Sequence, residues 1–162
     1  MASFVHVTDA RLIAGILRTG LRAERTRTGR RGVFCVPVVP NIQTTFQWVR
    51  ELKGRGYRTA GAVQFSVPDD ERVWVGRYGQ EPKAVGAARA VALFMSDADT
   101  RGWEVVVARG VHRRDIQRAR AVPQMAGWRH FPEAKGQRPF WPIPGAIKAA
   151  RTRVRIDEWA EG

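Results

Sequence analysis

Two short apolar runs separated by one sharply bounded helix constrain the fold of this chain more than any other feature of its sequence. Residues 3–7 (SFVHV) and 32–38 (GVFCVPV) are typical of strands. Between them, residues 9–19 are predicted to form a helix, because Asp9 or the threonine before it can cap the first turn and Gly20 is suited to end the last one. The apolar stripe of this helix is Leu12, Ile13, Ile16 and Leu17.

The remaining pattern predicts one α+β domain over residues 1–122, followed by an arm over residues 123–162. Pro37 suggests that the strand at 32–38 lies at a sheet edge or contains a bulge. The arm is rich in proline, aromatic residues and arginine, and we expect it to pack on the domain. Further strands are expected at 62–67, 72–78 and 103–108, and further helices at 41–54, 83–96 and 111–122.

The charge of the chain points to a polyanionic partner. Its 162 residues include 28 Lys and Arg against 15 Asp and Glu, which gives a net charge of +13. Such a field attracts nucleic acid before any specific contact forms. An arginine-rich proteome would explain the preference for Arg over Lys, but not the excess of bases over acids. The basic residues expected to bind nucleic acid are Arg25, Arg27, Arg30, Arg31, Arg113 and Arg114.

Several classes of protein are disfavoured by the sequence. Cys35 is the single cysteine, so an internal disulfide is excluded, and we expect it to be a small buried residue. The three histidines show no metal-ligand spacing, so no metal site is predicted. No run of about 18 apolar residues is present, and the first residues do not have the pattern of a secretory signal. We therefore expect a cytoplasmic protein without membrane contacts.

Four segments follow one another in an order that resembles the ADP-ribosyltransferase superfamily, in particular its DNA-modifying toxins. They are HVT (6–8) on the first strand, ILRTGL (16–21) closing the helix, GVF (32–34) opening the second strand, and Glu104 at the start of a later apolar strand. The resemblance implies a split, antiparallel-rich β-sheet with flanking helices, and NAD held in the cleft between its two halves.

The resemblance also implies a role for each of four residues. His6 anchors NAD by a hydrogen bond to a ribose hydroxyl, and Thr8 adds a second polar contact. Phe34, where the family commonly has tyrosine, packs against the nicotinamide ring. Glu104 bonds the ribose 2′-hydroxyl, stabilises the positive charge of an oxocarbenium-like state and can take a proton from the acceptor. The implied activity is that of an NAD-dependent ADP-ribosyltransferase acting on nucleic acid or another polyanionic acceptor.

Other interpretations of the same residues stay open. Without the resemblance, His6 is a core histidine bonded to a backbone carbonyl and Phe34 is a core residue. Glu104 is then a surface carboxylate paired with Arg101 or Arg109. Two other functions are also compatible with the sequence. One is RNA 2′-phosphotransfer on the same fold, which uses NAD to remove a phosphate from RNA, and the other is nucleic-acid binding without catalysis.

Overall fold

The computed structural model describes residues 1–25, 29–39, 45, 47–49 and 59–121. Contacts divide the chain into a unit of Met1–Arg129 and a unit of His130–Gly162, and the described residues belong to the first. They form one antiparallel sheet of eight strands with two α-helices, which confirms the α+β class. The predicted arm lies outside the described residues, and so does most of the predicted helix at 41–54.

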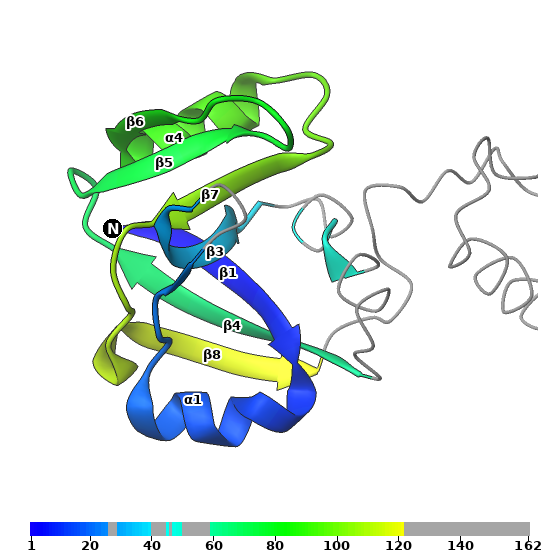
Figure 1. Cartoon of the computed structure of the whole chain (residues 1–162), viewed down its shortest axis with the longest axis vertical. Coiled ribbons are helices and arrows are strands. Elements are labelled where there is room, and N and C mark those ends of the chain that lie inside the picture. The colour runs from blue at the N-terminus through cyan, green and yellow to red at the C-terminus, as the bar shows by residue number, and fades with distance from the viewer. Residues whose placement is uncertain (26–28, 40–44, 46, 50–58, 122–162) are drawn as a thin grey trace, which may run out of the picture. The chain divides into compact units, whose positions relative to one another are not determined.

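Seven strands follow one another in the order β6–β5–β7–β3–β1–β4–β8, and β2 pairs with β3 beside this path (Figure 1). Every pair of neighbouring strands is antiparallel. The strands are β1 (Ala2–Asp9), β2 (Glu24–Arg25), β3 (Arg31–Pro37), β4 (Ala60–Val67), β5 (Arg72–Arg77), β6 (Lys83–Gly86), β7 (Trp103–Val107) and β8 (Ile116–Ala121).

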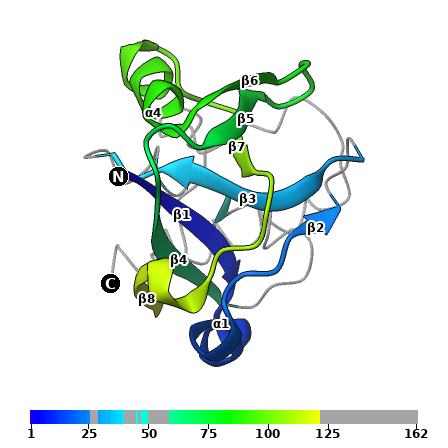
Figure 2. The same cartoon turned by 90° about the vertical axis from the view of Figure 1, so that its left-hand side faces the viewer.

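The sheet is divided into two halves by a short junction between β1 and β3. β1 pairs with β4 along its whole length, whereas it pairs with β3 only at Phe4↔Pro37 and Val5↔Val36. One half is therefore β1–β4–β8 and the other is β3–β7–β5–β6, and Figure 2 shows the two halves from the side. A residue that follows the junction on β1 lies where the two halves open.

The first helix has the local signals that the sequence predicts. Asp9 caps a short 3-10 turn, η1 (Ala10–Leu12), by accepting a hydrogen bond from the backbone N–H of Arg11. The chain continues into α1 (Ile13–Thr19), which ends at Gly20 with a φ of 87°. A side chain at Gly20 would also meet the Val111 carbonyl, with its Cβ 2.3 Å from the oxygen. Only glycine fits this position. No helix among the described residues is long and apolar enough to span a membrane.

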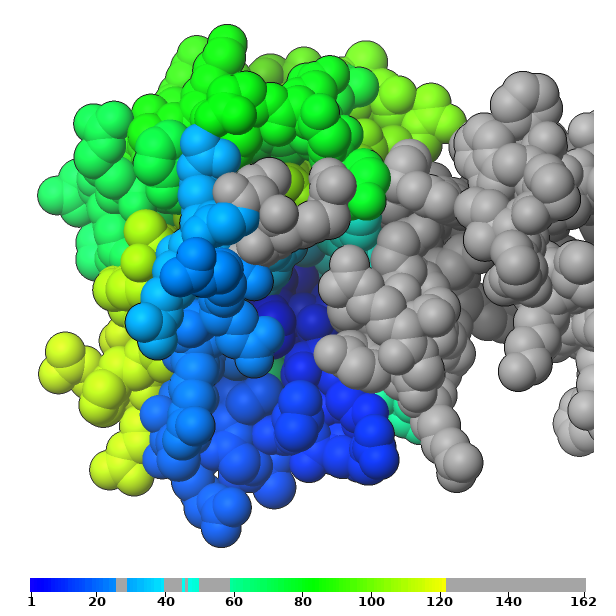
Figure 3. Space-filling view, viewed as in Figure 1, coloured from blue at the N-terminus to red at the C-terminus, as the bar shows by residue number. Residues whose placement is uncertain are grey.

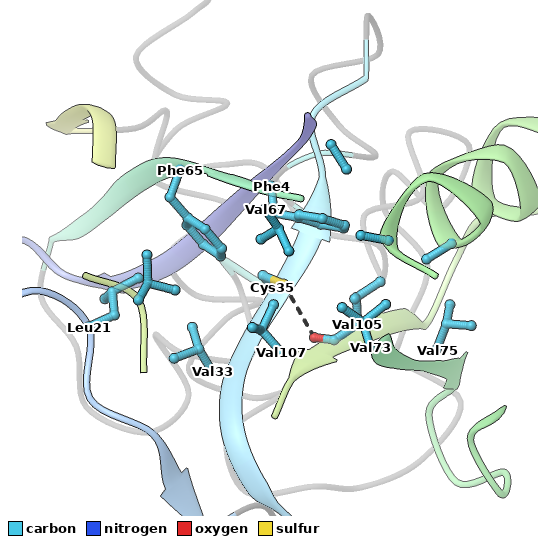
Figure 4. Close-up of a cluster of buried hydrophobic side chains, with 14 of the residues drawn as sticks. Phe4, Leu21, Val33, Cys35, Phe65, Val67, Val73, Val75, Val105 and Val107 are labelled. Carbon is cyan, nitrogen blue, oxygen red and sulfur yellow. Dashed lines mark hydrogen bonds between the residues drawn. The ribbon is translucent and has the colours of Figure 1, made fainter. Parts of the chain in front are cut away.

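The main core lies on one face of the sheet, here called face 1, and is covered by α1 and by α4 (Ala87–Ser96). Directly paired residues of antiparallel strands share a face, so Phe4 and Phe65 point the same way, as do Cys35 and Val105. The Cys35 thiol is buried there and donates to the Val105 carbonyl at 3.5 Å (Figure 4). Cys35 is thus a core residue, as expected.

Pro37 does not mark an edge strand. β3 lies at the centre of the sheet, between β7 and β1. Pro37 is the last residue of β3, two residues beyond Cys35, where the pairing with β7 ends at Cys35↔Val105. A proline at a strand end interrupts no further ladder. The prediction of an edge or bulge for 32–38 is therefore wrong.

Two other predictions of helices are wrong in part or in full. Residues 83–86 form the edge strand β6, and the helix begins only at Ala87. The segment 111–122 contains a 3-10 turn, η2 (Arg113–Asp115), followed by β8. β8 shows no apolar alternation because it is an edge strand, with only Ile116 and Ala119 packed against the core. In the arginine-rich segment 22–31, Glu24 and Arg25 form the short strand β2, which pairs with the start of β3.

Candidate functional site

His6 lies at the junction between the two halves of the sheet. Its Nδ1 donates a hydrogen bond to the backbone carbonyl of Phe34 at 2.7 Å. The paired part of β1 and β3 ends one residue earlier, at Val5↔Val36. Beyond this pair, the backbone of β1 no longer bonds to β3, and the side chain of His6 takes its place as the partner of the Phe34 carbonyl. This contact joins β1 to β3 where the two halves of the sheet separate.

The contact fixes the protonation pattern of the imidazole. A carbonyl oxygen can only accept, so Nδ1 must carry the proton. Burial lowers the pKa of His6 below its usual 6.5, although the hydrogen bond to Phe34 and the carboxylate of Glu24 act in the opposite direction. At neutral pH the ring is thus uncharged, and Nε2 keeps a lone pair that can accept a hydrogen bond from a hydroxyl.

Phe34 and Glu104 share the other face of the sheet, here called face 2. Phe34 pairs with Val106, and Glu104 precedes Val106 by two residues on β7. Side chains two apart on a strand point the same way, so Phe34 and Glu104 are diagonal neighbours about 7–8 Å apart at their Cα atoms. Both side chains are half-buried. The residue directly opposite Glu104 on β5 is Gly76, which places no side chain beside the carboxylate.

The structure brings some of the four predicted site residues together and not others. His6 contacts the backbone of Phe34, and Phe34 neighbours Glu104. Residues two apart on a strand share a face, so the side chains of His6 and Thr8 start on face 1 with that of Phe4, whereas Phe34 and Glu104 lie on face 2. Thr8 is only 5 % exposed, so it has little surface to offer a ligand. Figure 3 shows the surface hollowed beside the blue β2–β3 segment, with dark blue atoms of the first strand at the bottom.

The start of β7 is held by a network that fixes the backbone next to Glu104. Asp97 accepts hydrogen bonds from Arg77 at 2.7 Å and from the indole N–H of Trp103 at 2.9 Å. From the other side, the indole of Trp48 donates to the Trp103 carbonyl at 3.0 Å. Glu104 is therefore positioned by a backbone that is tied on both sides.

This network predicts loss of stability in acid. The hydrogen bond from Arg77 lowers the pKa of Asp97, and that from Arg101 lowers the pKa of Asp99 to about 2. A carboxyl whose pKa is lower in the folded state stabilises the fold above its unfolded pKa of about 3.9, and that stabilisation is lost as the pH falls through the folded value. Melting temperatures measured between pH 5 and 2 should therefore fall less steeply for Asp97→Asn than for the wild type. Equal slopes would contradict the prediction, and Asp70→Asn, which changes an exposed carboxylate on a turn, is the control.

A Trp–Arg pair on face 2 was not identified from the sequence. Trp74 pairs with Val106 on the side opposite to Phe34, so the three residues form a row across β5, β7 and β3. The guanidinium of Arg30 lies 4.7 Å from the centre of the Trp74 ring and is ion-paired with Glu81. The V-W-V alternation at 73–75 is the signal that could have found it, since it turns Trp74 away from the buried valines.

The six predicted nucleic-acid-binding arginines differ in how accessible they are. Arg25, Arg31, Arg113 and Arg114 are exposed. Arg30 is engaged with Trp74 and Glu81, and Arg27 lies outside the described residues. Arg118 and Arg120, which are not among these six, are also exposed, on β8 in the segment that was predicted to be a helix. Their alternation, IQRARA, was the signal for a strand.

The site as a whole can bind and polarise a ligand with hydroxyl groups. It offers an uncharged imidazole as hydrogen-bond acceptor where β1 and β3 separate, and a half-buried aromatic ring and a carboxylate on face 2 of β3 and β7. Among the described residues, no group of three or more His, Cys, Asp or Glu side chains could hold a metal ion. Comparison of the chain with protein-family models, with curated proteins and with solved structures finds no match.

Proposed function

We propose that this chain is an NAD-dependent ADP-ribosyltransferase that acts on nucleic acid or another polyanionic acceptor. The observation that carries the proposal is the contact of His6 with the Phe34 carbonyl where the two halves of the sheet open, with Glu104 on the next strand of the same half as Phe34. The residues of the family pattern thus lie on three adjacent strands, β1, β3 and β7.

Each of these residues supports one part of the reaction. The Nε2 atom of His6 can accept a hydrogen bond from a ribose hydroxyl of NAD and hold the nucleotide in place. The ring of Phe34 can pack on the nicotinamide. The bond between the nicotinamide nitrogen and ribose C1′ breaks with its electron pair leaving on nicotinamide, and the carboxylate of Glu104 stabilises the positive charge left on the sugar. The acceptor then bonds to C1′ and gives up a proton, which the carboxylate of Glu104 accepts.

The acceptor is proposed from where the positive charge lies. α1 contacts both η2 and β8, and Figures 1 and 2 show α1 and β8 side by side. In the described part of this region, the carboxylate of Asp115 in η2 forms ion pairs with Arg109 and Arg114. Glu71, on the turn between β4 and β5, is ion-paired with Arg109, and Glu81 lies between β5 and β6 in the other half of the sheet. The exposed arginines of the α1–η2–β8 surface are Arg18, Arg22, Arg113, Arg114, Arg118 and Arg120.

A titration with NAD and an assay of nicotinamide release test the proposal directly. NAD that binds only the folded chain should raise its melting temperature. Nicotinamide should be released faster when DNA or RNA is added, and ADP-ribose should become attached to the nucleic acid. A chain that binds no NAD and releases no nicotinamide with any nucleic acid offered is instead a binding module. Loss of phosphate from 2′-phosphorylated RNA would identify the phosphotransfer reaction.

The substitution His6→Ala is expected to weaken NAD binding. It removes one hydrogen bond, worth about 1 kcal/mol, so the Kd for NAD should rise roughly five- to tenfold. The wild type should also lose affinity as the pH falls below 6.5, because a protonated Nε2 can no longer accept from a hydroxyl. Calorimetric titration of both proteins from pH 8 to pH 5 measures the two effects.

The control for this experiment is His112→Ala, which removes the exposed histidine that precedes and caps η2. It should leave both the Kd at pH 7.5 and its pH dependence as in the wild type. If His6→Ala binds NAD as tightly as the wild type, His6 is a core histidine and not a ligand of NAD.

A further inference from the structure

Trp74 lies close to the proposed reaction centre although it is no part of the family pattern. It and Phe34 flank Val106 from opposite sides, and all three point to face 2. Glu104 is two residue pairs further along, opposite Gly76, so it is a diagonal neighbour of both aromatic residues. The two aromatic residues thus lie on the strands on either side of β7, both diagonal to the carboxylate, and only Phe34 is used by the proposed chemistry.

Packing does not explain Trp74. Its ring is half-buried, and it belongs to neither of the two apolar clusters formed by the described residues. What covers the ring is the Arg30 guanidinium, which is planar and positively charged. That guanidinium is also ion-paired with Glu81, and the two side chains are 28 % and 81 % exposed. Cation–π contacts and ion pairs at partly exposed sites are weak, so the guanidinium can leave the ring at little cost.

We propose that Trp74 is a stacking platform for an unpaired base of the acceptor nucleic acid, and that the base takes the place that Arg30 holds in the free protein. The inference rests on the proposed function for its ligand. A nucleobase has a flat π-face of the kind that stacks on tryptophan, and such stacking is stronger than the contact it replaces.

The location of Trp74 suits an acceptor better than NAD. A base that reacts must leave its duplex or belong to a single strand, and it must be held beside the group that activates it. Trp74 and Phe34 lie on the strands on either side of β7, so nicotinamide packed on Phe34 leaves the Trp74 side for the acceptor. Arg30, once it has left the ring, is close enough to contact a phosphate of the same strand.

Two variants that differ only in aromaticity test the proposal. Trp74→Phe keeps a ring, whereas Trp74→Leu keeps an apolar side chain without one. The affinity of each variant for fluorescently labelled single-stranded DNA and RNA homopolymers is measured by anisotropy at low salt, below the melting temperature of the variant. Trp74→Leu should bind about tenfold more weakly than the wild type, and Trp74→Phe should recover most of the loss. If the Leu and Phe variants bind alike, the platform is wrong.

The role of Arg30 is tested through Glu81. The substitution Glu81→Gln releases the guanidinium from its ion pair, so affinity for the homopolymers should rise several-fold. It should rise more than in Asp70→Asn, which removes an exposed carboxylate from a turn. In the Trp74→Leu background the extra gain should disappear, and a gain that persists there would overturn the displacement of Arg30.

Failure of this inference is distinguishable from failure of the proposed function. The homopolymer measurements need no NAD, and the NAD titration of the wild type needs no nucleic acid. If the wild type binds NAD and the Leu and Phe variants bind homopolymers equally, the platform fails alone. If NAD does not bind but the two variants differ, the platform holds and the enzymatic function fails.

Discussion

Replacement of Glu104 by glutamine is expected to lower the rate of NAD turnover by a factor on the order of 100 or more, while NAD binding is retained. Glutamine keeps the shape of the side chain and much of its hydrogen bonding, but it removes the negative charge. Lost electrostatic stabilisation of a charged transition state typically costs this much in rate. Nicotinamide release at saturating NAD measures kcat, and calorimetry gives the Kd separately.

The control for Glu104→Gln is the removal of a carboxylate that lies outside the site and should not affect NAD turnover. Asp70 is exposed on the turn between β4 and β5, outside the β1–β3–β7 region, and Asp70→Asn should release nicotinamide at the wild-type rate. The tied backbone at Trp103 should keep β7 in place in Glu104→Gln, so its melting temperature should stay near that of the wild type. An active wild type matched by Glu104→Gln would leave the fold unaffected and remove Glu104 from the mechanism.

The parts of the fold that could be predicted are those with a local physical signal. The first helix was predictable because its cap, Asp9, and its terminator, Gly20, act within one turn of their own backbone. β8 was not, because most of its side chains are exposed, including Arg118 and Arg120, and such an edge strand has no continuous apolar face. β6 was hidden for a related reason, since its small residues run without a break into the alanine-rich helix α4.

The candidate site could be predicted as a set of residues on strands but not as a set of contacts. The order of His6, Phe34 and Glu104 along the chain is visible in the sequence. The bond between His6 and the Phe34 carbonyl is not, because every residue has a carbonyl and only the end of β1–β3 pairing makes this one available. The Trp74–Arg30 contact likewise joins side chains that are distant in sequence, and the sequence predicts at most which way Trp74 points.

Removal of three arginines from the α1–η2–β8 surface is expected to weaken nucleic-acid binding on the order of 100-fold near 0.1 M salt. The triple variant is Arg113→Gln, Arg118→Gln and Arg120→Gln. Each phosphate contact that is lost should also reduce the slope of log K against log[salt] by roughly 0.7–0.9. Anisotropy titrations over a series of salt concentrations measure both quantities.

A matched variant separates a binding surface from the effect of net charge. Arg72→Gln, Lys83→Gln and Arg89→Gln together remove the same charge from exposed positions on β5, β6 and α4. If the long-range field of the whole protein dominates, the two triple variants lose affinity equally. If the phosphates contact η2 and β8, only the first variant shows a smaller slope of log K against log[salt]. The reason is that counterions are released only where an arginine contacts a phosphate. The alternative role of the β8 arginines is to protect this edge strand from pairing with another chain. In that case the first variant would self-associate in sedimentation experiments, and its slope of log K against log[salt] would stay at the wild-type value.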